Sequence, residues 1–164
     1  MEIILILIFV IFIASLFSNS EYIKNSSQIP TNEFFLFVED KNGQQYNVNI
    51  AVKNFPKLTA LNLKNKKHEW YVIGFAKNDR IELVYSHKGF DNSGVHAISP
   101  YLLDSIIKYK EPTSIFILHN HPNGNLTASK QDKISAKKMK IELEKRNIKL
   151  HEFICARGNF KKYF

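Results

Sequence analysis

Apolar runs separated by short polar turns recur along the chain from about residue 69 onward. Runs of roughly four to eight residues that are rich in Val, Ile and aromatic side chains are typical of strands. We predict strands at residues 70–76, 81–86, 113–118 and 150–156. Helical spacing instead predicts helices over 100–110, capped by Ser99, and over 129–147. Strands that alternate with helices predict a mixed α/β fold.

Between the polar linker and residue 69, the sequence predicts one turn and leaves one segment without a predicted element. Asn42 and Gly43 lie between an apolar run at 35–38 and the partly alternating residues 46–52. An Asn-Gly pair between two such runs predicts a β-hairpin. Residues 54–67 contain Pro56 among several Asn and Lys, and their pattern assigns no element.

Residues 3–17 form an apolar segment that carries no charge. As a helix it would span about 22 Å, which is shorter than the roughly 30 Å hydrocarbon core of a bilayer. We predict a membrane anchor or signal segment at 1–18, a polar linker at 19–33 and a folded domain at 34–164. Lys24 follows the segment and favours a cytoplasmic domain. A cleaved signal with export is the alternative, and a buried helix is the third interpretation.

Composition and charge narrow the classes of protein and site. The chain has 164 residues, of which 45% are apolar, and this length suits one domain. Its single cysteine, Cys155, excludes an internal disulfide and a four-cysteine zinc site. The net charge of +8 permits anionic partners such as nucleic acid or lipid headgroups. Because the basic residues are dispersed and form no arginine-rich patch, nucleic acid is not the favoured partner.

Side chains that bind metals follow the predicted strand at 113–118. His119 and His121 come directly after it, and Ser129 and Asp132 follow a short loop. Since side chains alternate along a strand, the two histidines are expected on one face. Three protein ligands with an open fourth position are typical of catalytic zinc. We therefore predict one Zn²⁺ per chain, bound by His119, His121 and Asp132, and hydrolysis by a metal-activated water.

Ser129 and Asp132 also have a purely structural interpretation. A helix-capping Ser with an acid three positions later resembles a capping box. At about 100° per residue, both share one helix face with Ala136, Met139 and Leu143. These apolar side chains are expected to pack on the core, which turns Ser129 and Asp132 toward the strand ends. We expect capping and metal binding to coexist.

Hydrolysis at zinc also requires a carboxylate that is not a ligand. Such a group takes the proton from the attacking water and passes it to the leaving amine. Glu69, at the start of the predicted strand 70–76, is the best candidate for this base. Glu82, on the predicted strand 81–86, and Glu111, before the predicted strand 113–118, are the alternatives. The purely structural interpretation of Glu69 is a solvated strand end.

The motif resembles that of a known family. Residues 119–125 read HNHPNGN, and together with Ser129 and Asp132 they resemble the JAMM motif of JAB/MPN metallopeptidases. The HNHPxG form and the EWYVI at 69–73 look most like the RadC-like branch. The resemblance covers about residues 66–159. It implies a JAB/MPN fold, which is a curved mixed sheet flanked by helices and similar to cytidine deaminases.

The resemblance also implies roles for individual residues. His119, His121 and Asp132 match the zinc ligands of the family. Glu69 matches its catalytic glutamate, which polarises the water, and Ser129 matches the serine that steadies the tetrahedral oxyanion. RadC-like proteins usually carry an upstream helix-hairpin-helix segment, and the Gly-hairpin pattern of such a segment is absent before residue 66.

Three functions compete at this point. The first is a zinc metallopeptidase or isopeptidase that cleaves an amide bond in a peptide or protein substrate. The second is a DNA-associated protein or metal-dependent nuclease, for which the basic charge and the RadC-like resemblance argue. The third is a non-catalytic interaction domain tethered to a membrane through residues 3–17. The sequence leaves the substrate and the oligomeric state open.

Overall fold

We describe the chain from a computed structural model, which covers residues 27–28, 43–89 and 98–164. The predicted anchor, the first strand of the predicted hairpin and most of the predicted linker lie outside these residues. The elements are β1 (Ser27–Gln28), β2 (Gln44–Ala51), α2 (Phe55–Leu63), β3 (Trp70–Lys77), β4 (Arg80–Lys88), α3 (Pro100–Lys110), β5 (Ser114–Asn120), α4 (Lys130–Glu144), β6 (Lys149–Ala156) and β7 (Asn159–Lys162). None of the helices in the described ranges is long and apolar enough to cross a membrane.

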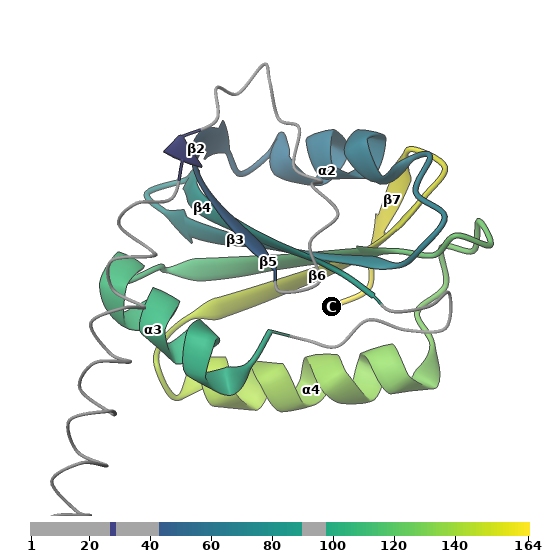
Figure 1. Cartoon of the computed structure of the whole chain (residues 1–164). Coiled ribbons are helices and arrows are strands. Elements are labelled where there is room, and N and C mark those ends of the chain that lie inside the picture. The colour runs from purple at the N-terminus through teal and green to yellow at the C-terminus, as the bar shows by residue number, and fades with distance from the viewer. Residues whose placement is uncertain (1–26, 29–42, 90–97) are drawn as a thin grey trace, which may run out of the picture.

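The strands form one mixed sheet in the order β1-β2-β4-β3-β5-β6-β7. β5 pairs with β6 in parallel and with β3 in antiparallel orientation. Helix α2 covers one face of the sheet, and α3 and α4 cover the other face (Figure 1). The predicted mixed α/β class with helices around a mixed sheet is therefore confirmed.

The pattern located most elements well. The predicted strands correspond to β3, β4, β5 and β6, and the second strand of the predicted hairpin is β2. β5 continues past its predicted end and includes His119 and Asn120. Both predicted helices are present, and the Ser99 side chain caps α3 by accepting the N–H of Leu102. α4 ends at Glu144, three residues before its predicted end.

Three elements escaped the prediction. Helix α2 begins in the segment without an assignment, and Pro56 occupies its first turn, where a missing N–H costs nothing. β7 is an edge strand whose residues are all exposed, so it has no apolar alternation to detect. Ser27–Gln28, inside the predicted linker, pairs with Tyr46 and Asn47 of β2.

The central strand β5 supports the site that follows. Ile115, Ile117 and Leu118 of β5 are each at most 1% exposed, because β5 is paired on both sides and covered on both faces. The chain crosses from β5 through α4 to the parallel strand β6. In such a crossover the helix begins near the edge at which the first strand ends. The topology therefore sets the first turn of α4 beside the end of β5.

Candidate metal centre

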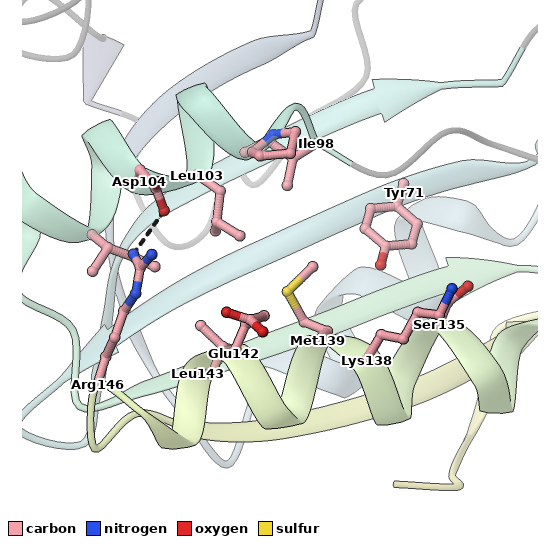
Figure 2. Close-up of a pocket in the computed structure, with 12 residues that line it drawn as sticks. Tyr71, Ile98, Leu103, Asp104, Ser135, Lys138, Met139, Glu142, Leu143 and Arg146 are labelled. Carbon is pink, nitrogen blue, oxygen red and sulfur yellow. Dashed lines mark hydrogen bonds and ion pairs between the residues drawn. The ribbon is translucent and has the colours of Figure 1, made fainter.

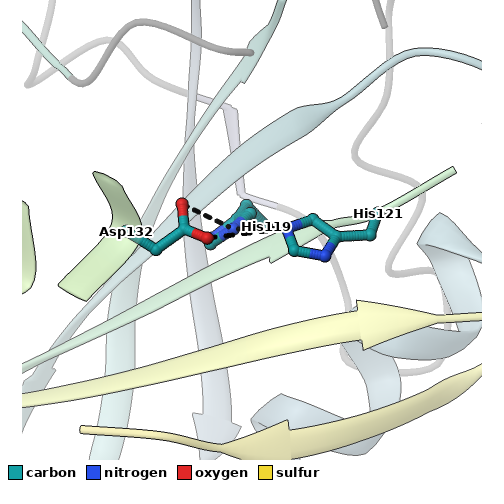
Figure 3. Close-up of side chains that lie close together, drawn as sticks. All are labelled: His119, His121 and Asp132. Carbon is teal, nitrogen blue, oxygen red and sulfur yellow. Dashed lines mark hydrogen bonds and ion pairs between the residues drawn. The ribbon is translucent and has the colours of Figure 1, made fainter. Parts of the chain in front are cut away.

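Two histidines meet where β5 ends. His119 is the penultimate residue of β5, and His121 follows the strand. Their Nε2 atoms lie 3.2 Å apart, and Figure 3 shows both rings turned toward the same point. The intervening Asn120 points away from them, as strand alternation requires. His119 is only 4% exposed, so one of the two rings is almost removed from water.

Asp132 reaches the same point from the first turn of α4. One of its carboxylate oxygens lies 3.4 Å from Nε2 of His119, and the other lies 3.7 Å from Nε2 of His121. The side chain comes from the helix and the rings come from the strand (Figure 3). The crossover topology thus joins residues that are separated by a loop in the sequence.

These distances fit a small divalent cation. Tetrahedral ligands with bonds of 2.0–2.1 Å to Zn²⁺ lie about 3.3 Å from one another. The observed separations of 3.2, 3.4 and 3.7 Å are close to this value. One ligand atom from each of His119, His121 and Asp132 lies within 4.8 Å of the others, so the group can hold a metal ion. Zinc as its identity stays a prediction.

The protonation states also fit a cation site. Nδ1 of His121 lies 3.0 Å from the carbonyl oxygen of Asn125, and a proton on Nδ1 leaves the lone pair of Nε2 for a metal. Burial lowers the pKa of His121, and the neighbouring His119 lowers it further. Burial would raise the pKa of Asp132, but hydrogen bonds with His119 and Ser129 hold it well below its usual range. Neutral imidazoles and an ionised carboxylate are the forms that bind metals.

Ser129 forms the predicted cap of α4. Its side-chain oxygen accepts the N–H of Asp132 at 3.1 Å, while its own N–H donates to the Asp132 carboxylate at 2.6 Å. This reciprocal pair is a complete capping box. It fixes the Asp132 carboxylate beside the histidines, so the cap and the candidate ligand are one structure. The catalytic role of Ser129 stays a prediction.

The three candidate carboxylates lie in different parts of the sheet. Glu111 forms an ion pair with Lys77, at the end of β3 that is far from the histidines. Glu82 precedes Leu83, which pairs with Phe75 of β3. That position is four residues along β3 from Tyr71, the partner of His119, or about 13 Å away. Neither glutamate lies at the metal-binding end of the sheet.

Glu69 lies at the correct end. Tyr71 pairs with His119 across β3 and β5, and continuing this antiparallel register brings Glu69 opposite His121. Glu69 is partly buried, and its carbonyl accepts the N–H of Gly89. Its position agrees with a base beside the metal, whereas its catalytic role stays a prediction.

Asn120 holds the chain on both sides of Glu69. Its Oδ1 accepts the N–H of Trp70 at 2.7 Å, and its Nδ2 donates to the carbonyl of His68 at 3.0 Å.

We expect Asn120→Ala to lower the free energy of unfolding by roughly 1–3 kcal/mol, because the buried N–H of Trp70 loses this acceptor. Urea denaturation of the metal-free protein measures the change. Asn62→Ala is the control, since Asn62 bonds only one turn back within α2, to Leu58. Equal losses in the two variants would contradict the bridging role.

A comparison with protein families decides the family. A family model described as the RadC-like JAB domain matches residues 60–163. The chain belongs to this family. This result confirms the family resemblance of the motif, and the matched residues include every residue of the candidate centre. A search of curated proteins found no match. Membership supports a metal-dependent hydrolytic or a DNA-associated function for this RadC-like JAB domain.

The structure adds residues that the sequence did not single out. Tyr71 stacks on His119 with ring centroids 6.2 Å apart, and Tyr163 meets the same ring edge-on at 6.3 Å. Glu152 on β6 is buried and accepts a hydrogen bond from the Tyr163 hydroxyl. Glu152 and Tyr163 lie outside the motif, so no spacing rule selects them. A glutamate directly before the apolar run at 153–156 of β6 was the one available signal.

A groove between α3 and α4 leads away from the RadC-like JAB centre. Its volume is about 460 Å³, and its apolar wall includes Leu103, Met139 and Leu143. Tyr71 and Ser135 line the end beside the candidate centre, and an ion pair between Asp104 and Arg146, at 2.7 Å, lies at the other end (Figure 2). None of the three candidate ligands lines the groove, which ends at Tyr71, the residue that stacks on His119.

Proposed function

We propose that this RadC-like JAB domain is a zinc-dependent hydrolase that cleaves an amide bond in a peptide, or an isopeptide bond. The observation that carries the proposal is the convergence of His119, His121 and Asp132 within 4.8 Å. Three protein ligands leave a fourth position for water or substrate, as in catalytic zinc sites. Zinc in this position would lower the pKa of a bound water to about 7 and polarise the scissile carbonyl.

The proposal gives the remaining residues distinct tasks. Glu69 accepts the proton of the attacking water and delivers it to the leaving amine. The Ser129 oxygen accepts the N–H of Asp132, so its own hydroxyl proton is directed to a second partner. That proton donates to the oxyanion that develops on the substrate. The capping box thereby holds a ligand and an oxyanion donor in fixed relation.

The groove supports a peptide-like substrate. An apolar channel with a few polar groups at its ends is typical of sites that bind an extended organic ligand. An apolar substrate side chain packed against Leu103 and Met139 would place the following bond near Tyr71 and the centre. Binding energy gained there would orient the scissile bond.

A DNA-associated function is the second candidate. The net charge of +8 and the RadC-like family favour it. Neutralisation of phosphates would make such binding strongly dependent on salt. A membrane-tethered interaction domain is a third proposal, which rests on the apolar residues 3–17 with the domain on the cytoplasmic side. A domain that only binds a partner would not need the three metal-binding side chains that this chain carries.

A substrate panel tests the proposed function. The purified chain is incubated with linear peptides, lysine isopeptides and single- and double-stranded DNA, each with and without a chelator. We expect amide cleavage that the chelator stops and added Zn²⁺ restores. DNA cleavage or salt-dependent DNA binding without amide cleavage would favour the second candidate. Amide cleavage that survives complete metal removal would overturn the proposal.

A further inference from the structure

A second carboxylate is buried beside the candidate metal centre. Glu152 lies on β6, where Ile117 is its partner in the parallel pairing with β5. Paired residues point to the same face, and His119 lies two positions beyond Ile117, so Glu152 and His119 share the face covered by α4. Adjacent strands and two residues of rise separate their Cα atoms by about 8 Å. Glu152 is only 3% exposed.

Tyr163 links this carboxylate to the metal-binding histidine. The Tyr163 hydroxyl donates to Glu152, and its ring packs edge-on against His119. The backbone joins the two as well, because the N–H of Tyr163 donates to the carbonyl of Glu152 at 3.1 Å. Glu152 is thus held by side-chain and backbone bonds on the His119 side of the sheet.

A buried acid at this place needs a physical reason. Glutamate is almost never fully buried without a partner, because a desolvated charge costs free energy. Burial raises the pKa of Glu152 overall, although the bond from Tyr163 and the nearby His119 oppose this rise, and Asp132 adds to it. The carboxyl group is therefore coupled electrostatically to two of the three candidate ligands.

The charge balance of the centre supplies the reason. Two neutral histidines and one aspartate leave a divalent ion with one uncompensated positive charge. His119 and Asp132 are largely buried, so water screens this charge poorly. We propose that the Glu152 carboxylate is a buried counter-charge that strengthens metal binding, and that Tyr163 is the residue that positions it. The inference rests on the proposed function only in requiring a divalent metal at this group.

Metal affinity of the whole chain tests the inference. Zn²⁺ dissociation constants are measured by competition with a chromophoric chelator, and the spectrum of bound Co²⁺ reports on the geometry. Glu152→Gln keeps the shape of the side chain and an acceptor for Tyr163, but it removes the charge. We expect it to weaken Zn²⁺ binding roughly 10–100-fold, as loss of groups around metal ligands typically does. The thermal midpoint of the metal-free variant should hold or rise, because a buried charge is gone.

A matched control and a second variant complete the design. Glu144→Gln removes a charge from the exposed side of α4, where Glu144 pairs with Lys140, and should leave Zn²⁺ affinity unchanged. Tyr163→Phe keeps the ring against His119 and removes the bond to Glu152, and it should weaken binding several-fold. If Glu152→Gln fails to fold, Tyr163→Phe decides the question. Unchanged affinity in the deciding variant would overturn the counter-charge role.

The same measurements separate this inference from the proposed function. Tight Zn²⁺ binding without amide cleavage would count against the hydrolase and leave the counter-charge intact. Equal Zn²⁺ affinities of the wild-type chain and Glu152→Gln would overturn the counter-charge role and leave the proposed hydrolase intact. A thermal midpoint that falls together with affinity would assign Glu152 a structural role, and would also overturn the inference.

Discussion

Glu69→Gln will remove amide hydrolysis and leave the metal bound. The amide keeps the size of the carboxylate but does not accept the proton of the attacking water. Loss of a general base typically costs about 10²–10⁴-fold in rate, and we expect a fall in kcat within this range. Metal content should stay at the wild-type level, because His119, His121 and Asp132 are untouched. Single-turnover kinetics and metal analysis of the same preparation provide the measurement.

Glu82→Gln and Glu111→Gln are the matched controls. Glu82 is on β4, about 13 Å along the sheet from the centre, and Glu111 follows α3 and pairs with Lys77 at the far end of β3. Each control should retain hydrolysis within about two-fold, as surface changes away from a site usually do. A Glu69→Gln variant that cleaves as fast as these controls would rule out the assigned base.

Loss of one ligand is expected to have an effect of similar size. His121→Ala leaves two protein ligands, and we expect its Zn²⁺ affinity to fall by more than roughly 100-fold, beyond the range seen for outer residues. Hydrolysis should disappear with the metal. The fold should persist, because the alanine variant keeps the backbone N–H of His121, which donates to the carbonyl of Cys155 on β6 at 2.9 Å. Competition titration and circular dichroism measure the two effects.

His151→Ala controls for the loss of a histidine. His151 is on β6, next to Glu152 in sequence, but it contacts Phe116 on the opposite face of the sheet and lies near Lys162. Its removal should change neither metal affinity nor hydrolysis. Dialysis of the wild-type chain against a chelator should reproduce the His121→Ala result reversibly. Tight Zn²⁺ binding by His121→Ala would show that the metal lies elsewhere.

The fold was predictable where local pattern and packing agree. Strands β3 and β5 show nearly continuous apolar runs because both faces of the sheet are covered, whereas β4 and β6 carry shorter apolar runs next to a glutamate. Helix α3 carried a Ser cap, a Pro at its first position and an apolar stripe. By contrast, α2 mixes polar residues with its buried Phe55, Thr59 and Leu63, and the exposed strand β7 is defined only by its bonds to β6. The spacing of apolar residues therefore predicts neither α2 nor β7.

Some residues of the candidate site were likewise predictable from local sequence, and others were not. His119 and His121 were predictable because residues two positions apart along an extended chain point to the same face. Ser129 and Asp132 were predictable because a capping box has a fixed spacing. The choice of Glu69 over Glu82 and Glu111 needed either the family resemblance or the strand register.

The sequence by itself therefore determined the kinds of ligand, their local spacing and the family, since these depend on neighbours within a few residues. The tertiary structure decided which distant groups meet at the centre. Strand order and register bring Glu69 to the end of β5 and keep Glu82 away from it. The parallel pairing of β5 with β6 places the buried Glu152 on the same face as His119, and Tyr163 reaches both residues from beyond β7. The physical reason is that charge and burial act through space, over distances that only the packed sheet defines.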